Sequence, residues 1–252
     1  MTSVLELDHI EKRFGIRTAV ADLSLSLPGG EIFGFLGPNG AGKTTTFKMI
    51  VGLLKPTSGT VRVLDMDVGE FPVDTKREIG FVPDTPLLYE KLTAMEYLRF
   101  VADLHDIPRA ESDPKAAELL RLFDLEGVAD DLIDTFSHGM KQKTALAGAL
   151  IHDPRLLILD EPTVGLDPRS ARLIKDILRR LTREGVTVIL STHILEIAEQ
   201  MCDRIGIINR GELIAVGTMD ELRSGAVNRS LEDIFLQLTS GDEYLELAAE
   251  QG

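Results

Sequence analysis

Residues 37–45, GPNGAGKTT, combine the glycines, lysine and hydroxyl groups that proteins use to bind phosphate. The stretch fits the pattern G-x-x-x-x-G-K-[ST] and lies between a predicted strand and a predicted helix, as that pattern requires. Gly40 and Gly42 let the backbone bend so that successive N–H groups point at phosphate oxygens. Lys43 can reach the β- and γ-phosphate oxygens of a nucleotide, and the Thr44 hydroxyl can bind Mg²⁺. The predicted phosphate-binding loop consists of Gly37, Pro38, Asn39, Gly40, Ala41, Gly42, Lys43, Thr44 and Thr45.

The stretch LLILDE, residues 156–161, supplies the carboxylates that such a site needs. Its four apolar residues predict a buried strand that brings Asp160 to its carboxyl end. Asp160 could hold Mg²⁺ through water, and Glu161 would lie beside the γ-phosphate, where it could orient and polarise a water molecule. Two solvated acids at the end of an ordinary strand are the alternative. The upstream phosphate-binding loop favours the catalytic interpretation.

A second place for an anion occurs in TFSHGMKQKTALAGAL, residues 135–150. Ser137 and Gly139 open an Ala-rich helix there, and the N–H groups at a helix N-terminus can meet a negatively charged group. The chain therefore carries two candidate phosphate sites, which raises the question of whose phosphate the second one binds.

The segments around these motifs alternate between strands and helices. Short, β-rich or continuously apolar stretches predict strands at 19–27, 31–37, 60–64, 156–161, 186–193 and 204–209. Helical spacing predicts helices at 43–54, at about 169–184 and up to about residue 202. Apolar strands that alternate with helices imply a parallel sheet buried on both faces, and the strand at 19–27 alternates as a half-exposed antiparallel strand would. A hairpin is expected around Arg210 and Gly211.

A helical insertion is predicted at about 87–153. Thr93 and Glu96 stand at the spacing of a capping box, and Asp113 is expected to cap a helix with Pro114 at its first position. We expect residues 1–217 to form the nucleotide-binding domain, and residues 218–252 to form a C-terminal helical extension.

Composition narrows the class of protein. The 252 residues carry a net charge of −14 and a sequence pI of about 4.8, which argues against a nucleic-acid partner. Cys202 is the one cysteine, so no intramolecular disulfide is expected and a reducing compartment fits. The first 15 residues do not read as a signal peptide, and no apolar run approaches the roughly 20 residues that span a bilayer. We therefore expect a chain that is soluble by itself and can still associate with a membrane protein.

Together the motifs resemble a known family. The phosphate-binding loop, FSHGM before a helix, LLILDEPTVGLDP and STH follow one another as in the nucleotide-binding subunits of ABC transporters. This resemblance covers nearly the whole chain. It implies an α/β P-loop NTPase (RecA-like) core with a parallel sheet, an N-terminal antiparallel β subdomain and an inserted α-helical subdomain. It also implies ATP and Mg²⁺ as cofactors, with Lys43, Glu161 and His193 as catalytic residues.

The resemblance assigns roles to residues that spacing alone does not. Phe14, in KRFG, matches the aromatic residue on which the family stacks adenine, and a buried core phenylalanine is the alternative. His193 resembles the histidine that contacts the γ-phosphate, although alone it would be interpreted as a structural loop residue. Asp167, in VGLDP, resembles the aspartate at which two subunits meet. It could equally cap the helix that begins at Pro168, and both roles can hold.

Two departures from the family pattern stand out. Asp84 stands where the family usually carries a glutamine that links the metal and the attacking water to the membrane partner. Asp84 can accept a hydrogen bond from water or bind Mg²⁺, but it cannot donate when ionised, and a solvated loop aspartate is the alternative. His138 and Met140 replace residues of the signature LSGGQ, while Ser137 and Gly139 are kept. Such signatures, together with the LEDIFLQLT tail, resemble ABC-2 type exporter subfamilies.

The family organisation offers an answer to the question of the second anion site. Two subunits, identical or different, pack head to tail, and each signature helix caps the ATP held by the other's phosphate-binding loop. The implied function is an ATP-hydrolysing motor subunit on the cytoplasmic face of the membrane, with a separate integral permease as its partner. A soluble ABC-type ATPase that acts on nucleic acid or ribosomes is the first alternative. A P-loop kinase is the second, although a kinase must exclude water rather than activate it.

Overall fold

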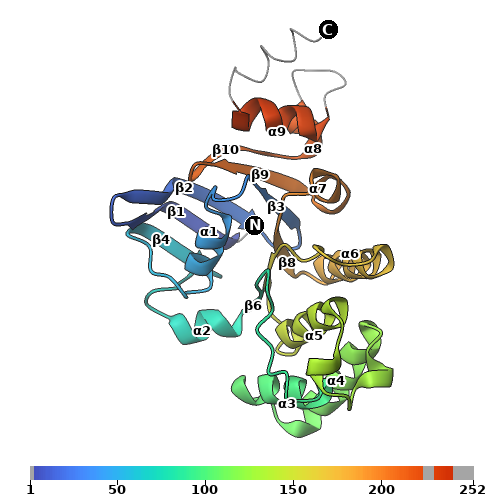
Figure 1. The fold of residues 1–252 in the computed structure, drawn as a ribbon. Helices are drawn as coiled ribbons and strands as arrows, with labels where there is room; N and C mark the ends of the chain where they lie inside the picture. Colours follow the sequence, from blue (N-terminus) through green and yellow to red (C-terminus); the bar gives the residue numbers. More distant parts are fainter. Residues whose placement is uncertain (1–2, 224–229, 241–252) are drawn as a thin grey trace.

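The computed structural model describes residues 3–223 and 230–240, and two β-sheets organise that part of the chain (Figure 1). The larger sheet has six strands in the order β10-β9-β3-β8-β7-β6. Strands β9, β3, β8, β7 and β6 run parallel, and β10 forms an antiparallel hairpin with β9. Their bounds are Ile32–Leu36 (β3), Ile79–Val82 (β6), Leu156–Asp160 (β7), Thr187–Thr192 (β8), Arg204–Asn209 (β9) and Glu212–Gly217 (β10).

Burial explains why the apolar runs become this parallel sheet. Every residue of β3, β7 and β8 is buried, as expected for strands covered on both faces. The predicted parallel core and the hairpin around Arg210 and Gly211 are therefore confirmed. Because these strands run in the same direction, the residues that follow β3, β7 and β8 meet at one edge of the sheet.

The smaller sheet is antiparallel, with the order β2-β1-β4-β5. Its strands are Ser3–Phe14 (β1), Arg17–Pro28 (β2), Ser58–Val63 (β4) and Met66–Asp67 (β5). In β2, buried Leu23, Leu25 and Leu27 alternate with exposed residues, which confirms the half-exposed antiparallel strand. Strand β1 was not predicted from the sequence, and its pairing register with β2 shifts between Leu7 and Ile10.

The helices lie around the larger sheet in separate groups (Figure 1). Helices α3, α4 and α5 lie between β6 and β7 in the sequence and gather at the end of the molecule opposite α8 and α9. The bounds of all helices are Lys43–Ile50 (α1), Pro72–Arg77 (α2), Ala94–Leu104 (α3), Arg109–Leu122 (α4), His138–Leu150 (α5), Pro168–Arg183 (α6), Leu195–Met201 (α7), Met219–Arg223 (α8) and Leu231–Ser240 (α9). Two short 3₁₀ helices, Glu126–Val128 and Ile133–Thr135, join α4 to α5.

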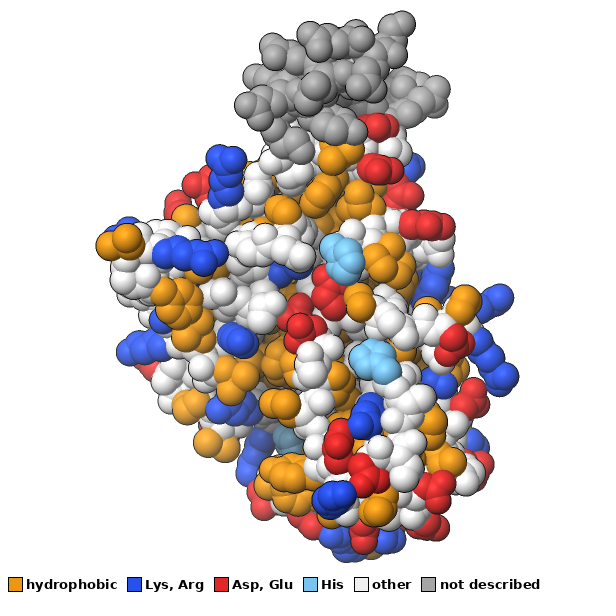
Figure 2. Space-filling view, in the orientation of Figure 1, with side chains coloured by type: hydrophobic (Ala, Val, Ile, Leu, Met, Phe, Trp, Pro, Cys, Tyr) orange, Lys and Arg blue, Asp and Glu red, His pale blue; other side chains and the backbone are white. Residues whose placement is uncertain are grey.

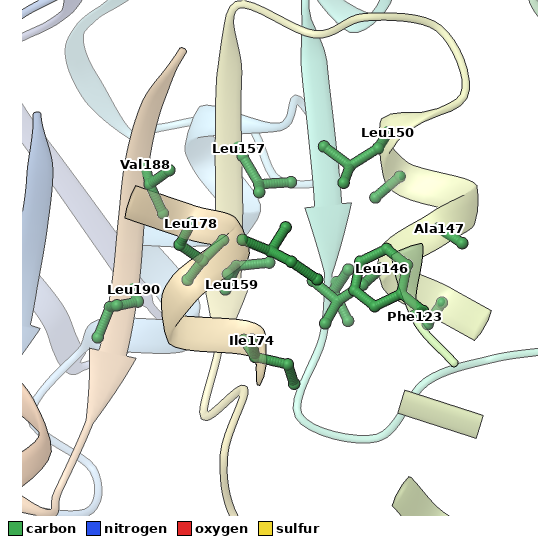
Figure 3. Packing of buried hydrophobic residues seen from close by; sticks show 14 of the residues in the cluster. Phe123, Leu146, Ala147, Leu150, Leu157, Leu159, Ile174, Leu178, Val188 and Leu190 are labelled. Carbon is green, nitrogen blue, oxygen red and sulfur yellow. The ribbon is translucent and has the colours of Figure 1, made fainter. Parts of the chain in front are cut away.

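One hydrophobic cluster ties the helices α3–α5 to the larger sheet (Figure 3). Phe123 at the end of α4 and Leu146 on α5 are 1% exposed. They belong to the same cluster as Leu157 and Leu159 of β7 and Leu178 of α6. Burial of such side chains stabilises the fold by about 2 kcal/mol each. The hydrophobic core therefore fixes the position of the signature helix α5 relative to the larger sheet.

The two helix starts predicted inside this insertion turn out differently. The capping box of α3 is confirmed, since the Thr93 hydroxyl accepts from the Glu96 N–H and the Glu96 carboxylate accepts from the Thr93 N–H. The prediction that Asp113 caps a helix with Pro114 at its first position is wrong, because α4 begins at Arg109 and contains Pro114. The N–H of Ser112 already donates to the Pro108 carbonyl at 2.9 Å.

Asp113 has another role that explains the error. Its carboxylate accepts two hydrogen bonds from the Arg99 guanidinium of α3, at 2.8 and 2.9 Å. This forked pair joins α3 to α4, and its hydrogen bonds lower the pKa of Asp113. Pro114 lies in the second turn of α4, where a proline removes one backbone hydrogen bond and crowds the carbonyl group four residues earlier, yet the helix continues through it.

The predicted helix at 43–54 is shorter than expected, since α1 ends at Ile50. Gly52, with φ at +69°, follows that end, and the N–H groups of Leu53 and Leu54 both donate to the Lys48 carbonyl at 2.9 Å. A glycine in this conformation commonly terminates a helix because other residues are strained there. The loop that leads to β4 therefore begins several residues before Pro56.

At the C-terminal end of the described chain, α9 packs against α7 and β9. Leu231 is 0% exposed, and its N–H donates to Glu199 Oε1 of α7 at 3.1 Å. The Asn209 amide of β9 donates to the Thr239 carbonyl at 3.2 Å. Of the predicted extension 218–252, residues 224–229 and 241–252 lie outside the described residues.

The surface carries both signs of charge. On the face drawn in Figure 2, lysine and arginine side chains are scattered among acidic ones. Among the described residues, ion pairs such as Lys91–Asp134 and Arg77–Asp106 bring the two signs together. No helix within 3–223 or 230–240 has the length and apolar character needed to cross a bilayer.

Candidate functional site

The predicted phosphate-binding loop joins the end of β3 to α1, and its glycines are required by its shape. Gly40 and Gly42 have φ values of +80° and +116°, in the region that favours glycine. A Cβ on Gly42 would lie 2.6 Å from the Ala19 carbonyl oxygen, and one on Gly37 would lie 2.4 Å from the Ile208 carbonyl oxygen. Neighbouring strands thus press directly on the loop and fix its path.

Lys43, the first residue of α1, is only 7% exposed. Its Nζ donates to the carbonyl oxygens of Gly37 at 2.6 Å and Pro38 at 3.3 Å. Burial lowers the pKa of Lys43, and the nearby carboxylates of Glu161 and Asp160 oppose that shift. The ammonium group is therefore held across the loop, close to both acids.

Thr44 and Asp160 are brought together from α1 and β7. The Thr44 hydroxyl donates to Asp160 Oδ2 at 2.8 Å, and the Ser191 hydroxyl of β8 donates to Asp160 Oδ1 at 2.5 Å. Asp160 is 2% exposed, so its carboxylate is fixed in a buried position. Adjacent oxygen ligands of this kind suit Mg²⁺, which usually takes one or two protein ligands and completes its shell with water and phosphate oxygens.

A larger protein cage for a metal is not seen. Within residues 3–223 and 230–240, no group of three or more His, Cys, Asp and Glu side chains could hold a metal ion. The hydroxyl of Thr44 and the carboxylate of Asp160 nevertheless fit Mg²⁺, provided that a nucleotide supplies the remaining oxygens.

Glu161 follows β7 and lies against the residues that follow β8. Its backbone has φ at +51°, an uncommon conformation for a residue with a side chain, and its N–H donates to the Ser191 hydroxyl at 3.0 Å. The carboxylate Oε1 lies 2.9 Å from His193 Nδ1. Oε2 is buried and has no hydrogen-bond partner among the described residues. One oxygen of Glu161 is thus engaged and the other is available to accept.

Lys43, Thr44, Asp160 and Glu161 line one pocket of about 410 Å³, whereas Gly37, Pro38 and His193 are not among its lining residues. Its walls include Asn39 to Thr45 of the loop, both acids after β7, and Phe14, Arg17, Ala19 and Asp84. Phe14 ends β1 and is 51% exposed, so the alternative of a core phenylalanine is wrong. Asp84 is exposed after β6, and its Oδ1 accepts from the Thr85 N–H at 2.7 Å. Phe14, the predicted surface for the base, and Asp84, which differs from the family pattern, therefore line the same pocket as the phosphate-binding loop.

Ser137 and Gly139 lie elsewhere. Neither lines this pocket. Ser137 is exposed and caps α5, since its hydroxyl accepts from the Met140 N–H at 3.3 Å. His138 Nε2 lies 3.2 Å from the Val164 carbonyl oxygen. The signature therefore packs against the segment after Glu161 of its own chain and lies outside the lining of its own chain's pocket.

Asp167 acts as a helix cap, which was one of its two predicted roles. Its Oδ1 accepts from the N–H groups of Arg169 and Ser170 at 3.0 Å each, and its Oδ2 accepts from the Ser170 hydroxyl at 2.7 Å. These hydrogen bonds lower the pKa of Asp167. Asp167 does not line the pocket.

Three residues in or beside the pocket were not predicted from the sequence, namely Arg17, Ala19 and Ser191. Ser191, which holds both Asp160 and Glu161, occupies the second-last position of an apolar strand and offers only its hydroxyl as a signal. Arg17 lines the pocket opposite Phe14 in the β1–β2 pairing. A basic residue three positions after the predicted base platform could have suggested it.

Comparison with known proteins gives consistent matches. A family model described as "ABC transporter" matches residues 20–164. The linearmycin resistance ATP-binding protein LnrL of Bacillus subtilis (strain 168) is 44% identical over 236 residues, which cover 94% of this chain and 75% of that protein. The Nod factor export ATP-binding protein I of Cupriavidus metallidurans is 35% identical over 243 residues, 96% of this chain and 78% of that protein.

Solved structures agree in fold. A structure described as the ATP-binding subunit of an ABC transporter has a TM-score of 0.88 and 34% identity, with 94% of this chain and 99% of that chain covered. The ATP-binding cassette MJ0796, solved as a dimer in a post-hydrolysis state with ADP and Pi, has a TM-score of 0.79 and 28% identity, with 85% and 98% covered.

Proposed function

The chain belongs to the ABC transporter family as one of its ATP-binding subunits, and we propose that it hydrolyses ATP to drive export through a separate integral membrane permease. The observation that carries this proposal is the pocket in which the phosphate-binding loop, Asp160 and Glu161 meet, with His193 in contact with Glu161 from outside the pocket lining. The export direction is supported by the similarity to a Nod factor export ATP-binding protein.

We assign the nucleotide as follows. Phe14 stacks on adenine, because an exposed aromatic ring on the pocket wall offers a face to a base. The backbone N–H groups of 37–45 and the Lys43 ammonium bind the phosphates. Thr44 and Asp160 would hold Mg²⁺, with Asp84 at the rim as a third oxygen donor. When bound, Mg²⁺ would neutralise phosphate charge in the pocket.

Glu161 is the residue best placed to act on water. Oε1 is held by His193, and Oε2 is buried without a hydrogen-bond partner in the described part of the chain, so the carboxylate is oriented and still has an acceptor. A water that donates to Oε2 would be polarised for attack on the γ-phosphate. His193 orients Glu161 and, from its exposed position, can contact the γ-phosphate. Lys43 stabilises the charge that develops on the transferred phosphoryl group.

We propose that two subunits, identical or different, complete each site together. Ser137 and Gly139 lie at an exposed helix start outside the pocket of their own chain, so they are available to the γ-phosphate held by a partner. Asp167 stands at the start of α6 on the segment that His138 contacts through Val164, and we place it at the same subunit contact. The dimeric state described for the cassette MJ0796 supports this arrangement.

The membrane side of the proposal concerns the segment after Asp84. Leu87 is 87% exposed and Tyr89 is 59% exposed, so two large side chains with apolar surface face solvent between β6 and α3. We propose that this segment contacts the integral permease, which places the chain at the cytoplasmic face of the membrane. We keep 1–217 as the ATP-binding domain, with its helical part at about 87–153, and 218–252 as an extension.

The proposal is tested by isolating the transporter. The tagged chain is captured from detergent-solubilised membranes, the retained integral protein is identified and co-expressed, and phosphate release is measured with Mg²⁺ or with a chelator. We expect Mg²⁺-dependent hydrolysis that rises when the integral protein is present. A complex that hydrolyses ATP equally without Mg²⁺, or a chain that retains no integral protein, would contradict it.

A further inference from the structure

Arg17 shares a hairpin with the proposed adenine platform. Phe14 and Arg17 are paired directly across β1 and β2, and only Gly15 and Ile16 separate them in the turn, where Gly15 has φ at +59°. Residues directly opposite each other in an antiparallel pair project from the same face of the sheet. Both side chains accordingly line the nucleotide pocket.

The Arg17 guanidinium is uncommitted. Among residues 3–223 and 230–240 it forms no ion pair and no side-chain hydrogen bond, and it is exposed to solvent. Its neighbours on the hairpin have partners. Lys12 Nζ donates to the Lys55 carbonyl at 2.6 Å and lies 5.3 Å from the centre of the Phe14 ring, and Arg13 donates to Glu11 at 2.5 Å. A Cβ on Gly40 would lie only 3.9 Å from Arg17 Nη2. The free cation therefore stands beside the phosphate-binding loop.

The charge balance of the pocket calls for such a cation. Three carboxylates, those of Asp84, Asp160 and Glu161, line the pocket, while Lys43 is the cation within the loop and is held by two carbonyl oxygens. A nucleoside triphosphate adds several more negative charges. An arginine fork matches phosphate oxygens and forms charge-assisted hydrogen bonds with them.

We propose that Arg17 binds the phosphate chain of the nucleotide, so that one hairpin supplies both the surface for the base and a second cation for the phosphates. This inference rests on the proposed placement of the nucleotide between Phe14 and the loop. Arg17 is then a binding residue that favours nucleoside triphosphates over uncharged nucleosides.

The test compares two substitutions of the same kind on one hairpin. Arg17→Ala and Arg13→Ala each remove one arginine, and Arg13 is paired with Glu11 at a position that does not line the pocket. Both are made in the Glu161→Gln background to prevent turnover, and calorimetry measures affinity for MgATP and for adenosine. We expect Arg17→Ala to weaken MgATP binding about tenfold and to leave adenosine binding unchanged. Arg17→Lys should recover part of the loss, and high salt should narrow the difference.

The outcomes separate this inference from the proposed function. If the chain with native Arg17 binds MgATP and Arg17→Ala binds it as tightly as Arg13→Ala does, Arg17 has no role in phosphate binding. An equal loss for adenosine would place Arg17 at the base or ribose and overturn the phosphate assignment. If the chain with native Arg17 binds no MgATP, or if Lys43→Ala leaves MgATP affinity unchanged, the nucleotide site itself is wrongly assigned. Both proposals are then refuted.

Discussion

His193 Nδ1 lies 2.9 Å from Glu161 Oε1, which joins the residues that follow the adjacent parallel strands β7 and β8. The histidine side chain is 53% exposed and the glutamate side chain 16% exposed, so the pair reaches from the pocket wall toward solvent. Because Oε1 is occupied, the acceptor left for water is Oε2, which is buried without a partner among the described residues. The arrangement orients one carboxylate oxygen by engaging the other.

Replacing Glu161 with glutamine should stop hydrolysis while keeping ATP binding. The amide retains the shape of the side chain but cannot polarise water, so we expect the rate of phosphate release to fall at least about 100-fold. MgATP affinity should change little. Glu184→Gln, at an exposed position paired with Arg180, is the matched control and should hydrolyse ATP normally. Native turnover in Glu161→Gln would remove Glu161 from the mechanism.

The parts of the fold that were predictable are those in which one physical requirement dominates. Strands β3, β7 and β8 are buried throughout, so their sequences are continuously apolar. The loop 37–45 needs glycine at Gly37 and Gly42, where a side chain would meet neighbouring carbonyl groups. Such constraints act locally, and they leave a direct signal in the order of the residues.

The parts that were missed depend on contacts between distant segments. Strand β1 was not predicted because its register shifts interrupt the alternation of buried and exposed residues. One such shift lies at His9, where φ is +48°. Asp113 was predicted to cap a helix, but its carboxylate accepts two hydrogen bonds from Arg99 on another helix. Arg17 lies in the pocket only because the hairpin folds over the loop. Neither the pairing of β1 nor that of Asp113 with Arg99 is encoded in a short motif, and for Arg17 the sequence signal is limited to its spacing from Phe14.

The stability of the chain should fall in mild acid because of His152. Its ring stacks on His105 with the centroids 3.8 Å apart, and its Nε2 lies 3.1 Å from the Ile79 carbonyl oxygen. Burial, the neighbouring His105 and Lys115 lower the pKa of His152 to about 4, although Asp153 and the Ile79 carbonyl oppose the shift. The folded state therefore binds fewer protons than the unfolded state, whose histidine pKa is near 6.5. Titration of His152 therefore leaves the free energy of unfolding unchanged above about pH 6.5 and lowers it as the pH falls toward 4.

His152→Gln should remove that pH dependence. Between about pH 7.5 and about pH 5.5, the free energy of unfolding should fall by about 1 kcal/mol less in the variant than in the native chain. Urea unfolding at each pH measures the difference, and the slope with pH matters rather than the absolute stability. His9→Gln is the control, since Asp22 raises the pKa of His9 and its contribution has the opposite sign. A variant with the native slope would show that the pKa of His152 is the same in the folded and the unfolded chain.

Asp84 should couple hydrolysis to the membrane partner. It lines the pocket and precedes the exposed Leu87 and Tyr89, so a change at the partner can reach the nucleotide through a short segment. We expect Asp84→Ala to reduce partner-stimulated hydrolysis about tenfold or more, while MgATP affinity changes less. Asp220→Ala, on the exposed surface of α8, should leave stimulation unchanged. If Asp84→Ala keeps native stimulation and native transport, Asp84 is a solvated loop residue without a role in coupling.

The signature should act on the partner's nucleotide, and mixed dimers can show it. One chain carries Lys43→Ala and the other Ser137→Arg, so each homodimer is inactive. If the signature acts across the dimer, one site of the mixed dimer combines both defects, and the other joins an intact phosphate-binding loop to an intact signature. Hydrolysis should then return to about half of the native rate when sites act independently. Two different affinity tags isolate the mixed dimer, and sedimentation with ATP verifies that it forms.

The same two substitutions placed in one chain give the matched control. A dimer of the double variant with a native chain has one damaged component in each site if the signature acts across the dimer, so it should be inactive. If Ser137 instead serves the loop of its own chain, the pattern reverses: the double variant leaves the native chain's site intact, and the separated substitutions damage both. The exposed position of Ser137 at the start of α5, outside the pocket that Lys43 lines, favours the first pattern. Activity in the double-variant dimer together with none in the dimer of single variants would therefore refute the shared site.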